Sequence, residues 1–241
     1  MTRRPERVTI ADENRPGPER REASLKTLAV IALKGGSGKT TVATHLALAA
    51  HRRGVDTLLV DTDPQFSARD ILGAREAPGP AYVESSGRNV LTAQFAALAE
   101  RKDLLIVDTA AGAVEAVSEA VVIADFVLMV ARPTLIDLSG LARSLMLVRR
   151  LGKPCAVVVN QAPVARENVE APLVKRAMKG LDYMKVEVAP AILRSRAIYQ
   201  VALERGRSVE ESSDRHAARE IAGLWDYVAE RIGLKAGDAE A

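Results

Sequence analysis

A short segment rich in glycine and lysine carries the clearest chemistry in this sequence. It reads Lys-Gly-Gly-Ser-Gly-Lys-Thr-Thr and runs from Lys34 to Thr41. Glycines have no Cβ atom, so successive backbone N–H groups in such a loop can converge on phosphate oxygens. Lys39 is then expected to reach the β- and γ-phosphates of a nucleotide, and the Thr40 hydroxyl to bind Mg²⁺. The simpler alternative is a glycine turn without a ligand.

The flanking residues place this loop between a strand and a helix. Residues 27–33 form a short apolar run that is typical of a buried strand in a parallel sheet. After the loop, Val42, Leu46 and Ala49 recur at helical spacing. Basic residues then precede Gly54, where the helix is predicted to end. The glycines therefore lie at a helix N-terminus, which is a natural position for a bound anion.

Carboxylates follow two further apolar runs. Asp61 and Asp63 come after residues 55–60, and Asp108 comes after residues 104–107. The C-terminal ends of neighbouring strands in a doubly wound sheet share one crevice, so these acids are expected to converge on the metal and the γ-phosphate. A single Asp at a strand end often only shapes a turn or caps a helix. Three of them beside a phosphate loop favour an ATPase site.

These motifs resemble those of the deviant Walker A ATPases of the ParA/MinD group. The matching segments are KGGSGKTT at 34–41, VDTDPQ at 60–65, IVDT at 106–109 and VVVN at 157–160. The resemblance covers the chain from about Lys26 to Ile232. It implies a P-loop NTPase fold of the SIMIBI type, with ATP and Mg²⁺ as cofactors.

The resemblance also implies a role for each matching residue. Lys34 would cross the interface of an ATP-sandwich homodimer and contact the phosphates of the partner. Asp63 would position the attacking water, Asp108 would hold Mg²⁺ through water, and Asn160 would contact adenine or merely shape a turn. The implied catalytic residues are Lys34, Lys39 and Asp63. The implied nucleotide-binding residues are Lys34, Gly35, Gly36, Ser37, Gly38, Lys39, Thr40, Thr41 and Asn160, and the implied metal-site residues are Thr40, Asp63 and Asp108.

One departure from the family pattern follows the third acid. Partition ATPases usually carry a Cys-Pro-Pro-like sequence at this place, whereas Asp108 is followed here by Thr-Ala-Ala-Gly. The departure favours an orphan member of the family over a standard chromosome partition protein.

Strands alternate with helices along the chain, which predicts a three-layer α/β/α fold with a mostly parallel sheet. The aliphatic-rich composition, with only 3% aromatic residues, suits strands buried between helices. We expect one ATPase domain at residues 25–234, a disordered tail at 1–24 and a flexible tail at 235–241. The other predicted elements are strands at 125–130 and 186–188, helices at 91–100, 137–150 and 169–179, and a turn-rich connection at 73–87.

The rarer residue types exclude several classes of protein. Cys155 is the only cysteine, so no disulfide is possible and the iron–sulfur relatives of this group are not indicated. It is expected to be a small buried hydrophobe. His45, His51 and His216 are too scattered to form a metal site and are expected on helix surfaces. No signal peptide or membrane-spanning run is present, which predicts a cytoplasmic protein.

Arginines accumulate in the last quarter of the chain. Relatives that bind DNA non-specifically use arginines of this region, and the resemblance points to Arg194, Arg196, Arg215 and Arg219. Such residues neutralise phosphates and give affinity without reading bases. The alternative is pairing with the acids of the same segment, and a net charge of +3 is mild for a nucleic-acid binder.

The two ends of the chain bear on its partners. An apolar stripe from Ile221 to Leu234 favours core packing over a membrane anchor, because the sequence after it is acidic. The charged residues 1–24 are expected to be a solvated tail or a partner-docking peptide. They are too few for a helix-turn-helix domain, so specific operator binding is not expected.

The function predicted from these features is a ParA-like switch. Its ATP-bound dimer would coat nucleoid DNA, and a ParB-like or other adaptor on a plasmid, chromosome or other large cargo would stimulate slow hydrolysis. The first alternative is a MinD-like regulator that acts on a membrane or a protein. The second is a small-molecule enzyme, such as an ATP-dependent carboxylase or phosphotransferase.

Overall fold

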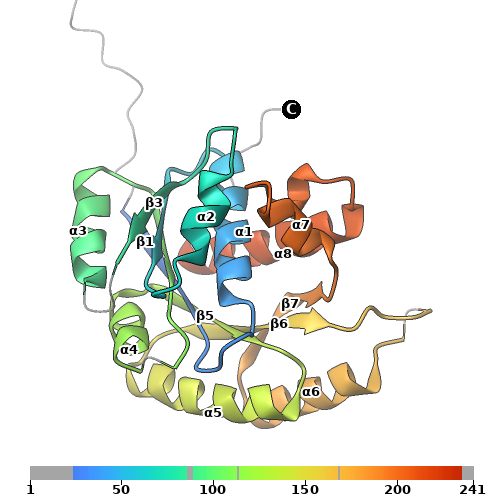
Figure 1. The fold of residues 1–241 in the computed structure, drawn as a ribbon. Helices are drawn as coiled ribbons and strands as arrows, with labels where there is room; N and C mark the ends of the chain where they lie inside the picture. Colours follow the sequence, from blue (N-terminus) through green and yellow to red (C-terminus); the bar gives the residue numbers. More distant parts are fainter. Residues whose placement is uncertain (1–23, 86–88, 113, 168, 235–241) are drawn as a thin grey trace, which may run out of the picture.

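The computed structural model describes residues 24–85, 89–112, 114–167 and 169–234. Both predicted tails lie outside these residues, apart from Ser24. The described chain forms a parallel seven-stranded sheet in the order β3-β2-β4-β1-β5-β6-β7, with helices on both faces (Figure 1). This arrangement confirms the predicted three-layer α/β/α fold.

The strands are β1 (Lys26–Ile31), β2 (Thr57–Asp61), β3 (Ala81–Glu84), β4 (Leu104–Asp108), β5 (Phe126–Ala131), β6 (Cys155–Ala162) and β7 (Glu187–Arg194). The α-helices are α1 (Lys39–Arg52), α2 (Ser67–Gly73), α3 (Val90–Ala99), α4 (Val114–Ile123), α5 (Leu135–Arg150), α6 (Pro172–Tyr183), α7 (Ile198–Leu203) and α8 (Arg215–Ile232). A short 3-10 helix, η1 (Val209–Glu211), joins α7 to α8.

The strand order changes direction at β1. The chain passes from β1 to β2, β3 and β4 on one side, and to β5, β6 and β7 on the other. In open α/β sheets, ligands bind at such a switch point, beyond the carboxyl ends of the strands. The glycine loop follows β1 directly and therefore lies at this position.

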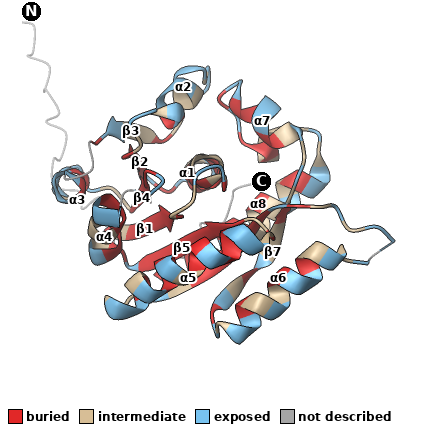
Figure 2. Ribbon diagram, turned by 60° about the horizontal axis from the view of Figure 1, so that its bottom comes forward, coloured by how far each residue is buried: buried red, intermediate tan, exposed pale blue. Residues whose placement is uncertain are grey.

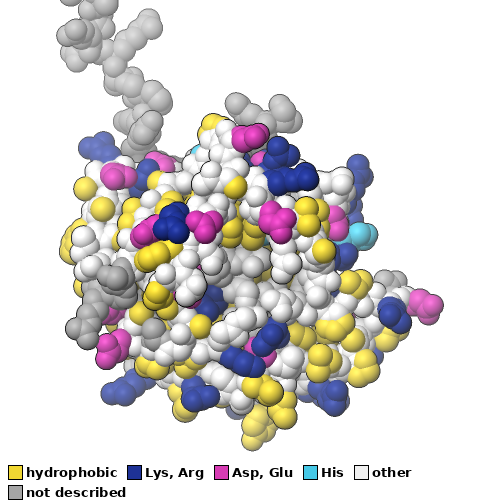
Figure 3. Space-filling model, in the orientation of Figure 1, with side chains coloured by type: hydrophobic (Ala, Val, Ile, Leu, Met, Phe, Trp, Pro, Cys, Tyr) yellow, Lys and Arg dark blue, Asp and Glu magenta, His cyan; other side chains and the backbone are white. Residues whose placement is uncertain are grey.

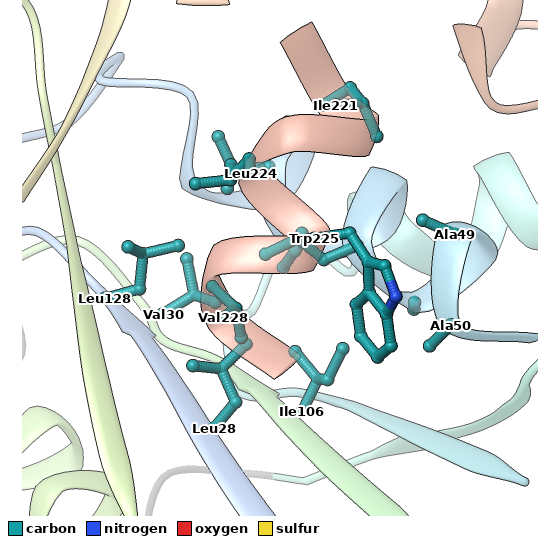
Figure 4. Close-up of a cluster of buried hydrophobic side chains, with 14 of the residues drawn as sticks. Leu28, Val30, Ala49, Ala50, Ile106, Leu128, Ile221, Leu224, Trp225 and Val228 are labelled. Carbon is teal, nitrogen blue, oxygen red and sulfur yellow. The ribbon is translucent and has the colours of Figure 1, made fainter. Parts of the chain in front are cut away.

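Two hydrophobic clusters hold the helices against the sheet. Helices α1, α7 and α8 cover one face, and α3, α4, α5 and α6 cover the other (Figures 1 and 2). Trp225 of α8 is fully buried beside Ala49 and Ala50 of α1 (Figure 4). Ile221, Leu224, Val228 and Ile232 are buried with it, which confirms that the apolar stripe of the last helix is core packing.

Four elements differ from the sequence prediction. Part of the expected turn-rich segment 73–87 is strand β3, which pairs with β2 at the sheet edge. Helix α4 was not predicted, and β7 continues from 187 to 194 through Pro190. An edge strand accepts proline because one side of its backbone has no strand to pair with. The helix expected at 169–179 is α6, which begins at Pro172.

The prediction that all three histidines lie on helix surfaces is wrong for His45. This residue is fully buried, because α1 is enclosed by the sheet and by α7 and α8. Its Nδ1 atom lies 2.9 Å from the carbonyl oxygen of Thr41, and its ring packs edge-on against Tyr199. Burial lowers the pKa of His45 to about 4. His51 is half-buried and His216 is exposed.

No helix among the described residues combines the length and the apolar character that crossing a bilayer requires. Cys155 is half-buried rather than fully buried, and burial raises the pKa of its thiol.

Candidate nucleotide site

The glycine loop connects β1 to α1, and two of its glycines have left-handed backbone conformations. Gly36 has φ +73° and Gly38 has φ +89°, a region that other residues rarely adopt. A Cβ atom on Gly38 would also lie 2.3 Å from Nδ2 of Asn160. Gly38 is therefore required both by its own conformation and by its neighbour.

The end of β6 holds this loop in place. The Asn160 side chain donates a hydrogen bond to the carbonyl oxygen of Ser37 at 2.8 Å, and that of Gln161 donates to Gly36 at 3.4 Å. Asn160 lies within β6 and is 6% exposed, so it does not shape a turn. Its adenine contact stays a prediction, whereas positioning of the loop is its observed role.

Lys39 is the first residue of α1 and lies near two acids. It is 6% exposed, and burial lowers the pKa of its ammonium group, while the charges of Asp108 and Asp63 act in the opposite direction. Lys39 and these two acids thus lie within electrostatic range of one another. Their action in one nucleotide site stays a prediction.

Asp61 serves the turn after β2. It lies opposite Asp108 in the register of β2 and β4, and both residues are fully buried. The Asp61 carboxylate accepts hydrogen bonds from the backbone N–H groups of Asp63 at 2.9 Å and of Ala68 at 3.2 Å. These bonds fix the chain between β2 and α2, and so position Asp63, which is half-buried.

The buried carboxylate of Asp108 is suited to binding a cation. Its two carboxylate oxygens are buried and have no hydrogen-bond partner of good geometry among the described residues. Burial raises its pKa to about 7, with a smaller contribution from Asp61, while the neighbouring Thr40 hydroxyl and Lys39 oppose the rise. Buried polar groups in proteins are normally satisfied, so these oxygens fit a hydrated Mg²⁺ ion beside Thr40.

Lys34 forms an ion pair with a residue of its own chain. Its Nζ atom lies 3.6 Å from Oδ2 of Asp137, in the first turn of α5. Asp137 is 4% exposed, receives a hydrogen bond from the Thr134 hydroxyl and pairs with Arg132 at 3.2 Å. A cavity of about 460 Å³ borders Lys34, and Gly112 and residues of α4 and α5 line the rest of it.

The contacts of Asp137 and Gln161 with the glycine loop were not predicted from the sequence. Thr134 and Asp137 have the spacing of a capping box, and Asp137 N–H does donate to the Thr134 hydroxyl, so a helix start at this place was detectable. Its contact with Lys34 was not, because the residues are far apart in the sequence. Gln161 had no signal beyond its position next to Asn160.

Two of the four predicted DNA-binding arginines are paired with acids, and the other two are exposed. Arg194 makes two hydrogen bonds to Glu170, at 2.8 and 2.5 Å, and Arg196 pairs with Glu220 at 3.1 Å. The alternative of pairing with nearby acids therefore describes these two residues. Arg215 and Arg219 are exposed on the first turns of α8 and have no ion pair within the described chain. Their contact with DNA stays a prediction.

The sequence model of the CobQ/CobB/MinD/ParA nucleotide binding domain matches residues 28–209. Because this match spans most of the chain, the protein belongs to that family. Its glycine loop, Lys39 and strand-end acids are thus parts of a nucleotide-binding domain.

Two curated proteins match different shares of the chain. The chain is 27% identical over 212 residues to the maintenance of carboxysome distribution protein A of Halothiobacillus neapolitanus, covering 84% of this chain and 95% of that protein. Over 57 residues it is 46% identical to the chromosome-partitioning ATPase Soj of Thermus thermophilus, which is 24% of this chain and 23% of that one.

Solved structures with the same fold include an ATP complex of Cyanothece McdA and the Mg-ADP complex of the septum site-determining protein MinD from Pyrococcus horikoshii. Both have a TM-score of 0.71, at 20% and 17% identity respectively. They cover 88% of this chain, and 97% and 98% of their own.

Proposed function

We propose that this protein is an ATP-hydrolysing switch that dimerises around ATP and uses the dimer to position a large cargo. The observation that carries this proposal is the fully buried Asp108 carboxylate, which among the described residues has only the Thr40 hydroxyl and the charge of Lys39 to offset its burial. A buried acid with so few partners is costly in a site with no ligand. It is useful where a cation and a nucleotide arrive together.

The residues of the site suit ATP with Mg²⁺. The loop N–H groups and Lys39 would bind the β- and γ-phosphates, and Thr40 and Asp108 would hold the metal, which neutralises phosphate charge when bound. Asp63 would orient the attacking water from the turn that Asp61 fixes. Basal turnover should be slow, since a half-buried carboxylate on a turn positions water poorly until a partner completes the site.

Positioning is supported by the relatives rather than by the site. One is named for maintenance of carboxysome distribution, and another for chromosome partitioning. We propose a cargo of this kind, a large assembly or a DNA molecule, together with a ParB-like or other adaptor that stimulates hydrolysis. A cytoplasmic, nucleoid-associated location would accompany this function.

The dimer would bind DNA without sequence preference. Arg215 and Arg219 are the two predicted arginines that are exposed. Arg219 lines a cavity of about 830 Å³ together with Arg194 and Arg196. These residues would contact phosphates, which supply sequence-independent affinity that weakens with salt. A MinD-like use of the α8 stripe as a membrane anchor is not favoured, because its apolar residues are buried in the core.

The direct test measures binding of the protein to a random DNA duplex with ATP, with ADP and without nucleotide. Binding that requires ATP and is lost in Lys39→Ala supports the switch. ATP-dependent dimerisation without any DNA binding would refute the proposed DNA binding. The alternative of a protein or membrane partner would then stand.

A further inference from the structure

A second concentration of positive charge lies on the outer side of α5 and α6. Its exposed cations are Arg143, Arg149 and Arg150 of α5, Lys175, Arg176 and Lys179 of α6, and Lys185 just beyond α6. Asp182 is the exposed acid of these two helices. Together the seven cations are called the α5–α6 face below.

These cations differ from most arginines elsewhere in the described chain. Within residues 24–234, apart from the gaps, none of the seven forms an ion pair with a carboxylate. In the opposite helical layer, by contrast, Arg53 pairs with Glu210 and Arg75 pairs with Glu211. Lys175 lies within electrostatic range of Glu170, but that carboxylate is already held by Arg194. Among the described residues, no carboxylate holds these cations, although Arg149 is hydrogen-bonded to backbone carbonyl oxygens.

The two helices form a rigid platform. They lie side by side on one face of the sheet (Figure 1). Their buried residues, such as Leu145 and Val174, belong to the hydrophobic cluster on that face. The guanidinium group of Arg149 donates hydrogen bonds to the carbonyl oxygens of Met184 and Lys185, each at 2.8 Å. These bonds join the C-terminal end of α5 to that of α6. In the lower part of the view, where the two helices lie, dark blue side chains alternate with hydrophobic ones (Figures 1 and 3).

The dimensions of this face suit a polyanion with closely spaced charges. Arg143 to Arg150 extend about 10 Å along α5, and neighbouring helix axes are about 8–10 Å apart. Duplex DNA carries one negative charge per about 1.7 Å of its axis, so several phosphates fit within this area.

An anionic membrane is less well matched to the same face. A helix that lies in a membrane interface turns a continuous apolar face toward the lipid. Here the buried apolar residues of α5 and α6 pack against the sheet, and Met146 and Tyr183 are large apolar side chains exposed on the same two helices as the cations. The exposed Leu135 and Ile136 lie at the other end of α5, next to Asp137.

We infer that the α5–α6 face is a second surface that binds the phosphate backbone of duplex DNA, separate from the α8 arginines. The inference rests on the DNA binding proposed above and extends it to a different part of the molecule. Asp137, in the first turn of α5, contacts Lys34 of the loop, so the helix that carries three of these cations also contacts the nucleotide site at its N-terminal end. A dimer would carry two such faces, and their combined contacts would strengthen binding.

The test uses fluorescence anisotropy on a random-sequence duplex over a salt series, with ATP. The variant Lys175→Gln, Arg176→Gln, Lys179→Gln removes three cations of the face. Its control, Arg101→Gln, Arg205→Gln, Arg207→Gln, removes the same charge from exposed residues elsewhere. We expect the first variant to bind at least tenfold more weakly at low salt and its log–log salt slope to fall by about 2–3. The control should stay within about threefold of wild type, and both should hydrolyse ATP normally without DNA.

The remaining outcomes separate this inference from the proposed function. If the face variant binds DNA as tightly as wild type while Arg215→Gln, Arg219→Gln does not, the inference is wrong and the DNA-binding function stands. If wild type dimerises with ATP but does not bind DNA, both are overturned. Binding to phosphatidylglycerol vesicles in place of DNA, lost in the face variant, would assign the surface to a membrane and overturn the DNA inference.

Discussion

The Nζ atom of Lys34 lies 3.6 Å from Oδ2 of Asp137, so the loop lysine is paired within its own subunit. Burial disfavours the ionised form of Asp137, but hydrogen bonds from Thr134 and Arg132 and the charge of Lys34 outweigh it, and its pKa lies below the usual value. If Lys34 is to contact the phosphates of a second subunit, this pair has to open first.

Weakening this pair should favour the dimer. In Asp137→Asn, Lys34 loses its ionic partner while the side chain keeps an oxygen for the Thr134 hydroxyl. We expect the ATP concentration at half-maximal dimerisation to fall at least threefold, measured by sedimentation velocity. The melting temperature should fall as well, because Arg132 loses the same partner. Dimerisation that requires more ATP than wild type would contradict a restraining role for Asp137.

The pair should also leave a signature at low pH. Since the folded pKa of Asp137 is depressed, its contribution to stability is full above the unfolded value near 3.9 and is lost as the pH falls through the lower folded value. Wild type should thus lose stability between about pH 5 and pH 2 more steeply than Asp137→Asn. Parallel melting curves for the two proteins over this range would argue against the ionised pair.

The stability contribution of Asp108 should depend on pH in the opposite direction to that of Asp137. Its pKa is raised to about 7 by burial, so its ionisation costs stability progressively as the pH rises from about 4 to 7. Without nucleotide, Asp108→Asn should therefore be more stable than wild type at pH 8, by about 1–4 kcal/mol. The difference should vanish near pH 4. With ATP and Mg²⁺ the order should reverse, because the variant loses the carboxylate that we assign to the metal. A less stable Asp108→Asn protein at pH 8 without nucleotide would refute the assignment of a strained, unpartnered acid.

Asn160 offers a test of its observed role against its predicted one. Asn160→Ala removes the hydrogen bond to the Ser37 carbonyl, which is worth about 1 kcal/mol. A loop-positioning role predicts that ATP and GTP affinities both fall about fivefold, as measured by calorimetry. A direct adenine contact predicts that the affinity for ATP falls much more than that for GTP.

The parts of this molecule that were predictable from sequence are those encoded locally. A strand, glycine loop and helix follow one another in the chain, and Asp63 and Asp108 are recognisable because each follows a buried strand. The pair of Lys34 with Asp137 was not predictable, since the order of the strands brings together residues that are far apart in the chain. His45 was misplaced for a similar reason: its own helix is amphipathic in pattern, but α7 and α8 return to cover its outer side.

The strand β3 at the sheet edge was also not predictable from the sequence. Strand β3 has four residues, is half exposed and follows Pro80, so its local pattern resembles a loop. Only the pairing of Leu58 with Ala81 and of Asp61 with Glu84 makes it a strand. Which arginines form ion pairs was not predictable either. Arg194 and Arg215 look alike in the sequence, yet Glu170 holds the first and the second is exposed.

Sedimentation velocity of wild type, Lys34→Ala and Lys39→Ala, each with ATP, with ADP and without nucleotide, tests most directly whether nucleotide state sets oligomeric state through Lys34. If Asp63 positions the attacking water as proposed, an Asp63→Ala background should slow hydrolysis and hold the ATP state. We predict a dimer for wild type with ATP alone, and a monomer that still binds ATP for Lys34→Ala. Lys39→Ala should neither bind nor dimerise. A Lys34→Ala protein that dimerises with ATP as wild type does would contradict the proposed switch.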